Sequence, residues 1–251
     1  MIGTPRESLV TVAVPSFNQA EFLGEALDSI FMQDVPAEVF VADGGSSDAS
    51  VSIIESREGH LAGWRSHADK GQSAAINECI DRGRAPFVCW LNSDDLLLPG
   101  ALRTLVDALQ GNPMAPVAYG QAWNQRQRDG RRSKVWVESF DERRLALRCF
   151  IAQPATLIRR SAWDAVGGLD ERLHMAMDYD LWWRLYRHAG PFRYVDSVLA
   201  VNREHDWTKT RNNRRLHYRE AMQVVRRHYG RVPLKWWLYQ PYSVWFKALR
   251  R

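Results

Sequence analysis

Two adjacent carboxylates follow a short apolar run in the stretch Cys89-Trp-Leu-Asn-Ser-Asp-Asp95. Residues 87–91 predict a buried strand, and Asp94 and Asp95 stand in the polar turn after it. Neighbouring carboxylates repel each other and lose hydration when they are partly buried. A bound cation would offset both costs, and Mg²⁺ or Mn²⁺ commonly takes one or two protein carboxylates together with diphosphate oxygens. The stretch therefore predicts a divalent metal site beside a diphosphate.

Three further polar clusters stand where predicted strands end. They are Pro15-Ser16-Phe17-Asn18, Asp43-Gly44-Gly45-Ser46 and Asp69-Lys70-Gly71-Gln72. Each alone is typical of an ordinary turn. In open α/β sheets, however, ligands bind beyond the carboxyl ends of the strands, so we expect all four clusters to meet at one edge. Together they favour a nucleotide site in which Asp43 accepts from a base or ribose hydroxyl and the two glycines let the backbone approach closely.

Strand and helix patterns alternate through residue 111, which predicts an α/β sheet with a largely parallel core. The expected strands in this part are 9–14, 37–42, 61–68 and 86–91, and the expected helices are 19–32, 49–56, 70–82 and 99–110. After residue 111 the alternation loosens. The later expected strands are 116–123, 134–138, 156–159, 192–196 and 198–204, and the later expected helices are 178–188 and 210–229. Neither G-x-G-x-x-G nor G-x-x-x-x-G-K-[ST] is present, which disfavours a Rossmann dehydrogenase and a P-loop NTPase.

The composition is that of an ordinary globular protein, with 251 residues, 45% hydrophobic and 25% charged. No apolar stretch approaches the roughly 20 residues of a membrane helix, and the N-terminus has no signal-peptide pattern. The three cysteines, Cys79, Cys89 and Cys149, lie in apolar settings without metal-ligand spacing. We therefore expect buried, reduced thiols in a cytoplasmic protein.

The net charge of +5 is unevenly distributed along the chain. Residues 201–251 contain 13 Lys and Arg against 3 Asp and Glu, which leaves 21 against 26 for the first 200 residues. An acidic body suits metal binding, whereas a basic tail suits an anionic partner. The two parts are therefore expected to do different things.

The segments TVAVPSFNQAEFLGEALDSIFMQ, VADGGSSDAS, DKGQSAAINECI, FVCWLNSDD and VGGLDERLHMAMDYDLWWRL occur in this order. In this combination the chain resembles glycosyltransferase family 2 from about residue 10 to residue 205. The resemblance implies the inverting mechanism and the GT-A fold, a Rossmann-like α/β fold with a mixed, mainly parallel central sheet and flanking helices. We expect a catalytic domain over 1–207, with a nucleotide-sugar half (1–111) and an acceptor half (112–207), and a helical appendage over 208–251.

The resemblance also implies a nucleotide-diphosphate sugar, commonly a UDP sugar, as the donor. The residues that it assigns to donor binding are Pro15, Ser16, Asn18, Asp43, Asp69, Lys70, Asn92, Ser93 and Asp94. Asn92-Ser93-Asp94 matches the D-x-D element of the family, whose last Asp binds Mn²⁺ or Mg²⁺. The first position is Asn here, so a contact usually made by a carboxylate is weaker or neutral, and Asp95 is expected to support Asp94.

The same resemblance assigns the chemistry to Asp178, the base that takes the proton of the acceptor hydroxyl in a single displacement; Asp180 is the runner-up. Arg203-Glu-His205 matches a late Arg-x-His element, in which His205 completes the metal shell or touches the diphosphate. Residues 206–210 are polar enough to form a lid over the diphosphate. Gln153, Pro154 and Trp163 are expected near the acceptor, a saccharide or a lipid-linked saccharide of bacterial surface-polysaccharide assembly.

The tail allows two interpretations. Leu234, Trp237, Leu238, Tyr242, Trp245 and Leu249 recur at roughly helical spacing, with Lys235, Lys247, Arg250 and Arg251 beside them. Such a segment either binds an anionic membrane surface, which would place the protein on the cytoplasmic face of the inner membrane, or packs on the catalytic domain or on a second subunit.

Three other functions remain open from the residues alone. A sugar nucleotidyltransferase would carry a Gly-rich, basic phosphate loop after the first strand, and Pro15-Ser-Phe-Asn18 has neither property. A nucleic-acid-binding protein would use the basic tail but would leave the acidic cluster of the body unexplained, so no nucleic-acid partner is expected. A catalytically impaired sugar-nucleotide binder is allowed by Asn92.

Overall fold

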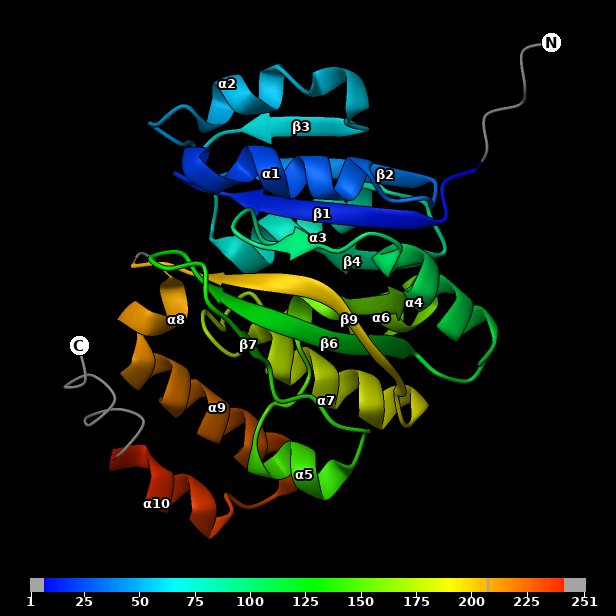
Figure 1. Ribbon diagram of the computed structural model, residues 1–251. Coiled ribbons are helices and arrows are strands. Elements are labelled where there is room, and N and C mark those ends of the chain that lie inside the picture. Colours follow the sequence, from blue (N-terminus) through cyan, green and yellow to red (C-terminus); the bar gives the residue numbers. More distant parts are fainter. Residues whose placement is uncertain (1–6, 207, 242–251) are drawn as a thin grey trace.

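The computed structural model describes residues 7–206 and 208–241. Its strands form one nine-stranded sheet with the order β3-β2-β1-β4-β8-β6-β9-β5, and β7 pairs with β6 (Figure 1). The strands are β1 (Val10–Ser16), β2 (Ala37–Asp43), β3 (Gly63–Ser66), β4 (Phe87–Trp90), β5 (Leu96–Leu97), β6 (Val117–Arg126), β7 (Arg132–Lys134), β8 (Thr156–Arg159) and β9 (Arg193–Glu204).

The direction of the strands decides where a ligand can bind. β1, β2, β3 and β4 are parallel, β8 is antiparallel to both β4 and β6, and β9 is parallel to β6. β5 and β7 run against β9 and β6. The described sheet is thus mixed and mainly parallel, as expected. In Figure 1 the arrows of β1 and β3 end on the left side of the molecule, where α8 also lies, so the polar turns after the parallel strands collect at that edge.

Helices cover both faces of the sheet and form two hydrophobic cores. The α-helices are α1 (Ala20–Phe31), α2 (Ser50–Glu55), α3 (Gln72–Arg82), α4 (Ala101–Gln110), α5 (Glu142–Leu147), α6 (Arg160–Val166), α7 (Met177–Ala189), α8 (Lys209–Asn212), α9 (Arg214–Tyr229) and α10 (Leu234–Pro241); Glu58–His60 and Gln153–Ala155 are 3₁₀ turns. Helices α1 and α4 pack on one face, because each presents an apolar stripe to the strands. Helices α3, α6, α7 and α9 pack on the other.

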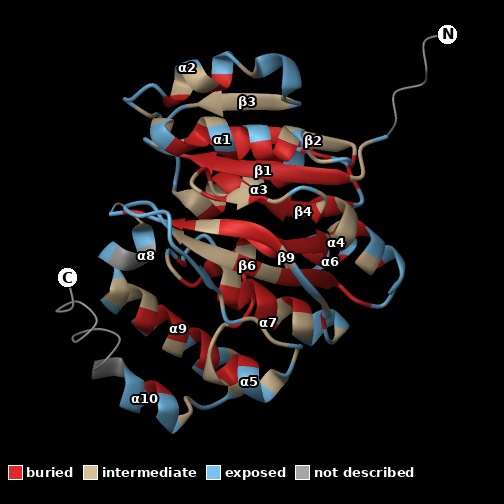
Figure 2. Cartoon of the chain, in the orientation of Figure 1, coloured by how far each residue is buried: buried red, intermediate tan, exposed pale blue. Residues whose placement is uncertain are grey.

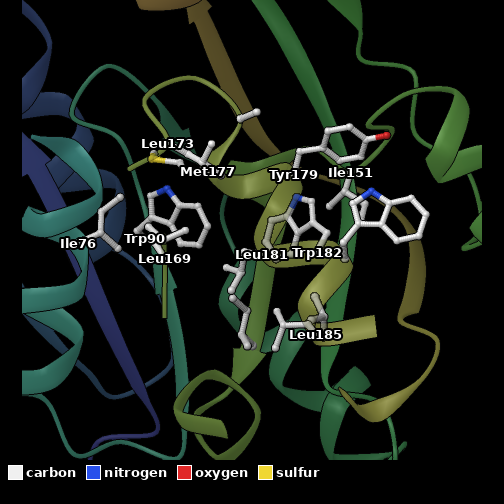
Figure 3. Close-up of a cluster of buried hydrophobic side chains, with 14 of the residues drawn as sticks. Ile76, Trp90, Ile151, Leu169, Leu173, Met177, Tyr179, Leu181, Trp182 and Leu185 are labelled. Atoms are coloured by element: carbon white, nitrogen blue, oxygen red, sulfur yellow. The ribbon is translucent and has the colours of Figure 1, made fainter. Parts of the chain in front are cut away.

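A tryptophan pair lies in the core that α3, α6, α7 and α9 form with the sheet. The rings of Trp90, at the end of β4, and Trp182, on α7, stack with centroids 5.9 Å apart and planes 14° apart (Figure 3). Both side chains are at most 2% exposed. Burial of apolar surface stabilises the fold by about 25 cal/mol per Å², so two buried side chains of this size together contribute roughly several kcal/mol to stability. The contact fixes α7 against the strand that ends in the Asn92–Asp95 turn.

Several predicted elements differ from the structure. The strand predicted at 134–138 is wrong, because the strand here is β7, which covers Arg132–Lys134 and ends where the predicted one begins. The strands predicted at 192–196 and 198–204 form the single strand β9. The helix predicted at 210–229 is divided at Asn213 into α8 and α9. The short elements α5, α6 and β5 were not predicted, because six- and seven-residue helices and a two-residue strand give too few positions for a periodic pattern.

The basic tail is described in part. Tyr218, Val224, Val225 and Trp236 belong to the same core as α7, so α9 and the inner side of α10 pack on the body of the protein (Figure 2). The tail residues Tyr242, Trp245, Lys247, Leu249, Arg250 and Arg251 lie outside the described residues. Within the described ranges, no helix is both long and apolar enough to cross a bilayer. Cys79 and Cys89 are buried free cysteines, whereas Cys149, expected to be buried as well, is only half-buried.

Candidate active site

The polar turns at the carboxyl edge of the sheet enclose a cavity of about 1000 Å³. This volume is at the upper end of the range for ligand pockets in proteins. The predicted residues that line it are Pro15, Ser16, Asn18, Asp69, Asn92, Ser93, Asp94, Asp95, Gln153, Pro154 and Asp178. Among the residues that the structure describes, Asp43, Lys70, Trp163, Asp180, Arg203 and His205 are not part of its wall. The sequence therefore predicted the place of the cavity, but six of the residues assigned to it do not line it.

The turn after β1 contains a residue in the left-handed backbone conformation. Asn18 has φ 52°, a conformation that Asn tolerates better than most residues. Its Oδ1 accepts from Ser47 N at 2.9 Å, and its own N–H donates to Ser46 Oγ at 2.7 Å. The hydroxyl of Ser16 is buried and has no hydrogen-bond partner within the described chain. Because Ser16 lines the cavity, this hydroxyl is a buried polar group directly beside the cavity.

Asp43 shapes the next turn rather than facing the cavity. It is fully buried, and its carboxylate accepts from Gly45 N (3.0 Å), Ser46 N (2.8 Å) and Ser66 Oγ (2.7 Å). Burial acts to raise the pKa of Asp43, but the hydrogen bonds from the two serines and Gly45 outweigh it, so the pKa is lowered. Its position supports the turn that presents Gly44 to the cavity.

Of the adjacent residues Asp69 and Lys70, only Asp69 lines the cavity. Asp69 lines the cavity, accepts from Gly71 N at 2.8 Å and pairs with Arg65 at 3.1 Å. Gly71 has φ 113°, which favours glycine, and it leads directly into α3. Lys70 is exposed. The side chain that the structure brings to this wall is instead Gln72, in the first turn of α3.

Asp94, which lines the cavity, forms a close pair with His205, which lies behind the cavity wall. His205 Nε2 and Asp94 Oδ2 are 3.0 Å apart, and His205 Nδ1 is buried without a partner among the described residues. The ring of His205 also packs on Phe22, with centroids 4.6 Å apart. In the described chain no cluster of three or more His, Cys, Asp or Glu is placed to hold a metal ion. A carboxylate with one imidazole still fits a cation that takes its other ligands from a diphosphate.

Asp95 is buried behind Asp94 and serves the turn. Burial first, and the neighbouring charge of Asp94 second, raise the pKa of Asp95 well above its ordinary value. Asp95 Oδ1 accepts from Arg203 N at 3.2 Å. The guanidinium of Arg203 donates to the Asp94 carbonyl at 2.5 Å and to Glu25 at 2.6 Å. Arg203 therefore holds the main chain of the Asn92–Asp95 turn from behind and does not line the cavity.

Asp178 lies in the first turn of α7 and lines the cavity. Its backbone neighbour Tyr179 N donates to Oδ1 at 2.7 Å. Burial raises the pKa of Asp178, while this hydrogen bond and the nearby basic side chains of His217 and Lys209 act to lower it. A carboxylate with a raised pKa is a stronger base once it is ionised. The arrangement therefore provides a proton acceptor inside the cavity.

Asp180, the alternative base, points elsewhere. It is fully buried, and its carboxylate pairs with Arg184 at 2.7 Å, His228 at 2.7 Å and Arg227 at 3.2 Å. Burial acts to raise the pKa of Asp180, but the hydrogen bonds from His228 and Arg184 outweigh it and lower the pKa. Its partners join α7 to α9, so its role is structural in this arrangement. Trp163 likewise is buried in the core, 6.2 Å from the ring of Trp90.

Sequence reasoning missed the residue that holds the start of α7. Glu220, on α9, is 5% exposed, and its carboxylate accepts from three successive backbone N–H groups: His174 at 3.1 Å, Met175 at 2.7 Å and Ala176 at 3.1 Å. Ala176, the N-cap of α7, has no side chain that could cap the helix. A carboxylate from another helix therefore satisfies the donors and complements the helix dipole. About 45 residues separate the partners, so no local pattern could indicate the contact.

Replacing Glu220 by Gln is expected to lower the free energy of unfolding by about 2 kcal/mol, because one amide oxygen remains for three donors and the charge is lost. Urea unfolding measures this change. Glu55→Gln, at an exposed position of α2, is the matched control and should leave the unfolding free energy within about 0.5 kcal/mol of wild type. Equal stability of the Glu220→Gln protein and wild type would refute the capping role.

Comparison with known proteins agrees with this architecture. The family model described as Glycosyl transferase family 2 matches residues 11–167. The chondroitin synthase of Escherichia coli is 22% identical over 239 residues, which cover 94% of this chain and 35% of that protein. The chain therefore spans about a third of the length of this relative.

Two solved structures share the fold. One is S. aureus TarS 1-349 in complex with UDP-GlcNAc, with a TM-score of 0.68 and 18% identity over 87% of this chain and 66% of that one. The other is the mannosyltransferase PcManGT from Pyrobaculum calidifontis in complex with GDP-Man and Mn²⁺, with a TM-score of 0.67 and 20% identity over 95% of this chain and 71% of that one. Their folds are glycosyltransferase folds of the GT-A type, which confirms the expected fold class.

Proposed function

The chain belongs to glycosyltransferase family 2, and from that premise we propose that it is an inverting enzyme that moves a hexosyl group from a UDP sugar to a hydroxyl of a saccharide or lipid-linked saccharide. The observation that carries the proposal is the single cavity lined by Asp94 at one place and Asp178 at another. One carboxylate suits the diphosphate end of a donor, and the other suits the acceptor hydroxyl. Both types of group are needed for transfer in one step.

The proposed reaction is a single displacement. Asp178 accepts the proton of the acceptor hydroxyl while the hydroxyl oxygen forms a bond to the anomeric carbon of the donor. The bond between that carbon and the diphosphate oxygen breaks at the same time, and the nucleoside diphosphate leaves with the electron pair. Because attack and departure occur on opposite faces, the anomeric configuration inverts. No nucleophile of the protein is required.

The donor would be oriented by the walls of the same cavity. Ser16 presents an unpartnered hydroxyl, and Gly44 allows close approach of a nucleoside. Asp94 and His205 would hold Mn²⁺ or Mg²⁺, which supplies charge neutralisation for the departing diphosphate. Lys209, a cation at the cavity wall on α8, stands where the sequence predicts a lid. Residue 207 of that segment lies outside the described residues.

Calorimetric titration tests the donor. The chain is titrated with UDP-, GDP- and dTDP-linked sugars, each with Mn²⁺ and with EDTA. The proposal expects binding of a UDP sugar that EDTA weakens at least tenfold. Binding of GDP or dTDP sugars alone would correct the nucleotide, and no binding across the panel would reject the donor site. One relative named above is a chondroitin synthase, which supports assembly of a surface polysaccharide as part of the proposal. The titration identifies the sugar.

We also propose that α10 contacts an anionic membrane surface. Leu234, Trp237 and Leu238 are 70%, 55% and 68% exposed, at positions i, i+3 and i+4 of the helix, whereas Trp236 is buried. Exposed Arg231 and Lys235 adjoin this apolar face. Trp and Leu beside basic residues suit the headgroup region of a bilayer, where each cation adds about 1 kcal/mol with anionic lipids. The acceptor would then be lipid-linked.

Changing both Trp237 and Leu238 to Ser is expected to weaken binding to phosphatidylglycerol vesicles at least tenfold, because the apolar contact is removed from the interface. Co-sedimentation with the full chain measures the effect. Met114→Ser, at an 82% exposed position far along the chain from α10, is the matched control. If both proteins sediment alike, or if wild type forms a dimer through this face instead of binding vesicles, the membrane proposal is wrong.

A further inference from the structure

A chain of side-chain amides crosses the cavity floor and centres on Asn92. On one side, Lys209 Nζ donates to Gln72 Oε1 at 3.1 Å. Gln72 Nε2 in turn donates to Asn92 Oδ1 at 2.7 Å. These contacts join the segment after His205 to the start of α3 and then to the metal-binding turn. All three side chains line the cavity.

On the other side, the amide nitrogen of Asn92 has two acceptors. Asn92 Nδ2 donates to Asp95 Oδ2 at 3.1 Å and to Gln153 Oε1 at 3.2 Å. Gln153 Nε2 then donates to the Trp90 carbonyl at 2.9 Å. Asn92 thus connects the carboxylate behind the turn with the wall that carries Gln153 and Pro154.

The polarity of this chain is fixed at both ends. The ammonium of Lys209 can only donate, so Gln72 must present its oxygen to Lys209 and its nitrogen to Asn92. At the far end, the Trp90 carbonyl can only accept, so Gln153 presents its nitrogen to Trp90 and its oxygen to Asn92. Asn92 must therefore accept on one side and donate on the other. An amide does both, whereas an ionised carboxylate only accepts.

We propose that Asn92 is a positioning residue, an amide junction that fixes the segment bearing Lys209, the Asp94–Asp95 turn and Gln153 in one arrangement, and that Asp cannot replace it in this chain. The proposal rests on the proposed function, since the arrangement it fixes is the donor site. It explains why the first position of the D-x-D element departs from the usual Asp: an Asp here would place a carboxylate oxygen about 3 Å from the Asp95 carboxylate and from the Gln153 oxygen. Asp94 is then left as the carboxylate of this element that faces the donor.

The variant Asn92→Asp distinguishes this inference from the usual D-x-D element, in which position 92 would bind the metal. The two predict opposite changes in the affinity for the donor. Here the variant should lower the Tm of the chain, measured with EDTA and without donor, by about 5 °C, and should weaken binding of the UDP sugar with Mn²⁺ at least tenfold. If Asn92 were instead a weakened metal ligand, Asp would leave the Tm unchanged and would tighten metal and donor binding. That result would overturn the inference.

The exchange variant Asn92→Asp with Asp95→Asn provides the matched control. The exchange variant has the same net charge as wild type. The new amide at position 95 can donate to the carboxylate at position 92 and can still accept from Arg203 N. At least half of the lost Tm should return. A Tm no higher than that of Asn92→Asp would reject the polarity argument. If wild type binds no sugar nucleotide, the proposed function fails, while the two melting comparisons still decide the role of Asn92.

Discussion

Asp178→Asn is expected to reduce the rate of sugar transfer about 10³-fold, within the range that general-base catalysis contributes. Asn keeps the size of the side chain but cannot take the proton of the acceptor hydroxyl. Donor affinity should change less than threefold, because Asp178 is assigned to the acceptor. The free energy of unfolding should stay equal or rise, because burial disfavours the ionised form of Asp178 and Asn carries no charge to desolvate.

Turnover and calorimetry on the same preparation separate these effects. Asp81→Asn, at an exposed position of α3, is the control for loss of a carboxylate. A folded Asp178→Asn protein that transfers sugar at a near-normal rate would show that another group is the base. Asp180→Asn should instead lower stability, because its carboxylate pairs with Arg184, Arg227 and His228 in the core.

The pH dependence has a defined sign. Burial raises the pKa of Asp178, and only the ionised form is a base. The rate should therefore fall as the pH drops through this raised pKa, at a higher pH than for an ordinary Asp. In the Asp178→Asn protein the residual rate should lack this acidic limb.

Asp94→Asn is expected to reduce transfer by about 10²- to 10³-fold, because the cavity loses the carboxylate that would hold the cation at the leaving diphosphate. Donor affinity with Mn²⁺ should fall to the level that wild type shows with EDTA. The Tm should change little, because the Asp94 side chain is 21% exposed and its carboxylate pairs with His205, a contact that an amide can keep. Transfer that stays at the wild-type rate, or that remains equally sensitive to EDTA, would contradict the assignment to Asp94.

The first half of the fold could be predicted from sequence because its signals are local. Four buried strands alternate with amphipathic helices there, and each strand ends in a turn rich in Asp, Asn, Ser or Gly. These turns do meet at one edge, where Ser16, Asn18, Asn92 and Asp94 line one cavity. Parallel topology alone is enough to bring them together.

The remaining contacts depend on pairs that are distant in sequence. Glu220 caps a helix about 45 residues earlier, and Lys209 reaches Gln72 across 137 residues. The two carboxylates Asp178 and Asp180 are indistinguishable by pattern, but two residues along a helix correspond to a rotation of about 200°, so one faces the cavity and the other the core. The identity of Asn92 likewise has meaning only once its donors and acceptors are in place.

The most direct test of the central claim is nucleotide release by the purified chain, measured with UDP sugars, a saccharide acceptor and Mn²⁺. The account predicts acceptor-dependent release of UDP, abolished by EDTA, with a product of inverted anomeric configuration by NMR. A chain that releases nucleotide equally well after Asp94→Asn and Asp178→Asn, or a product that retains the donor's configuration, would contradict it.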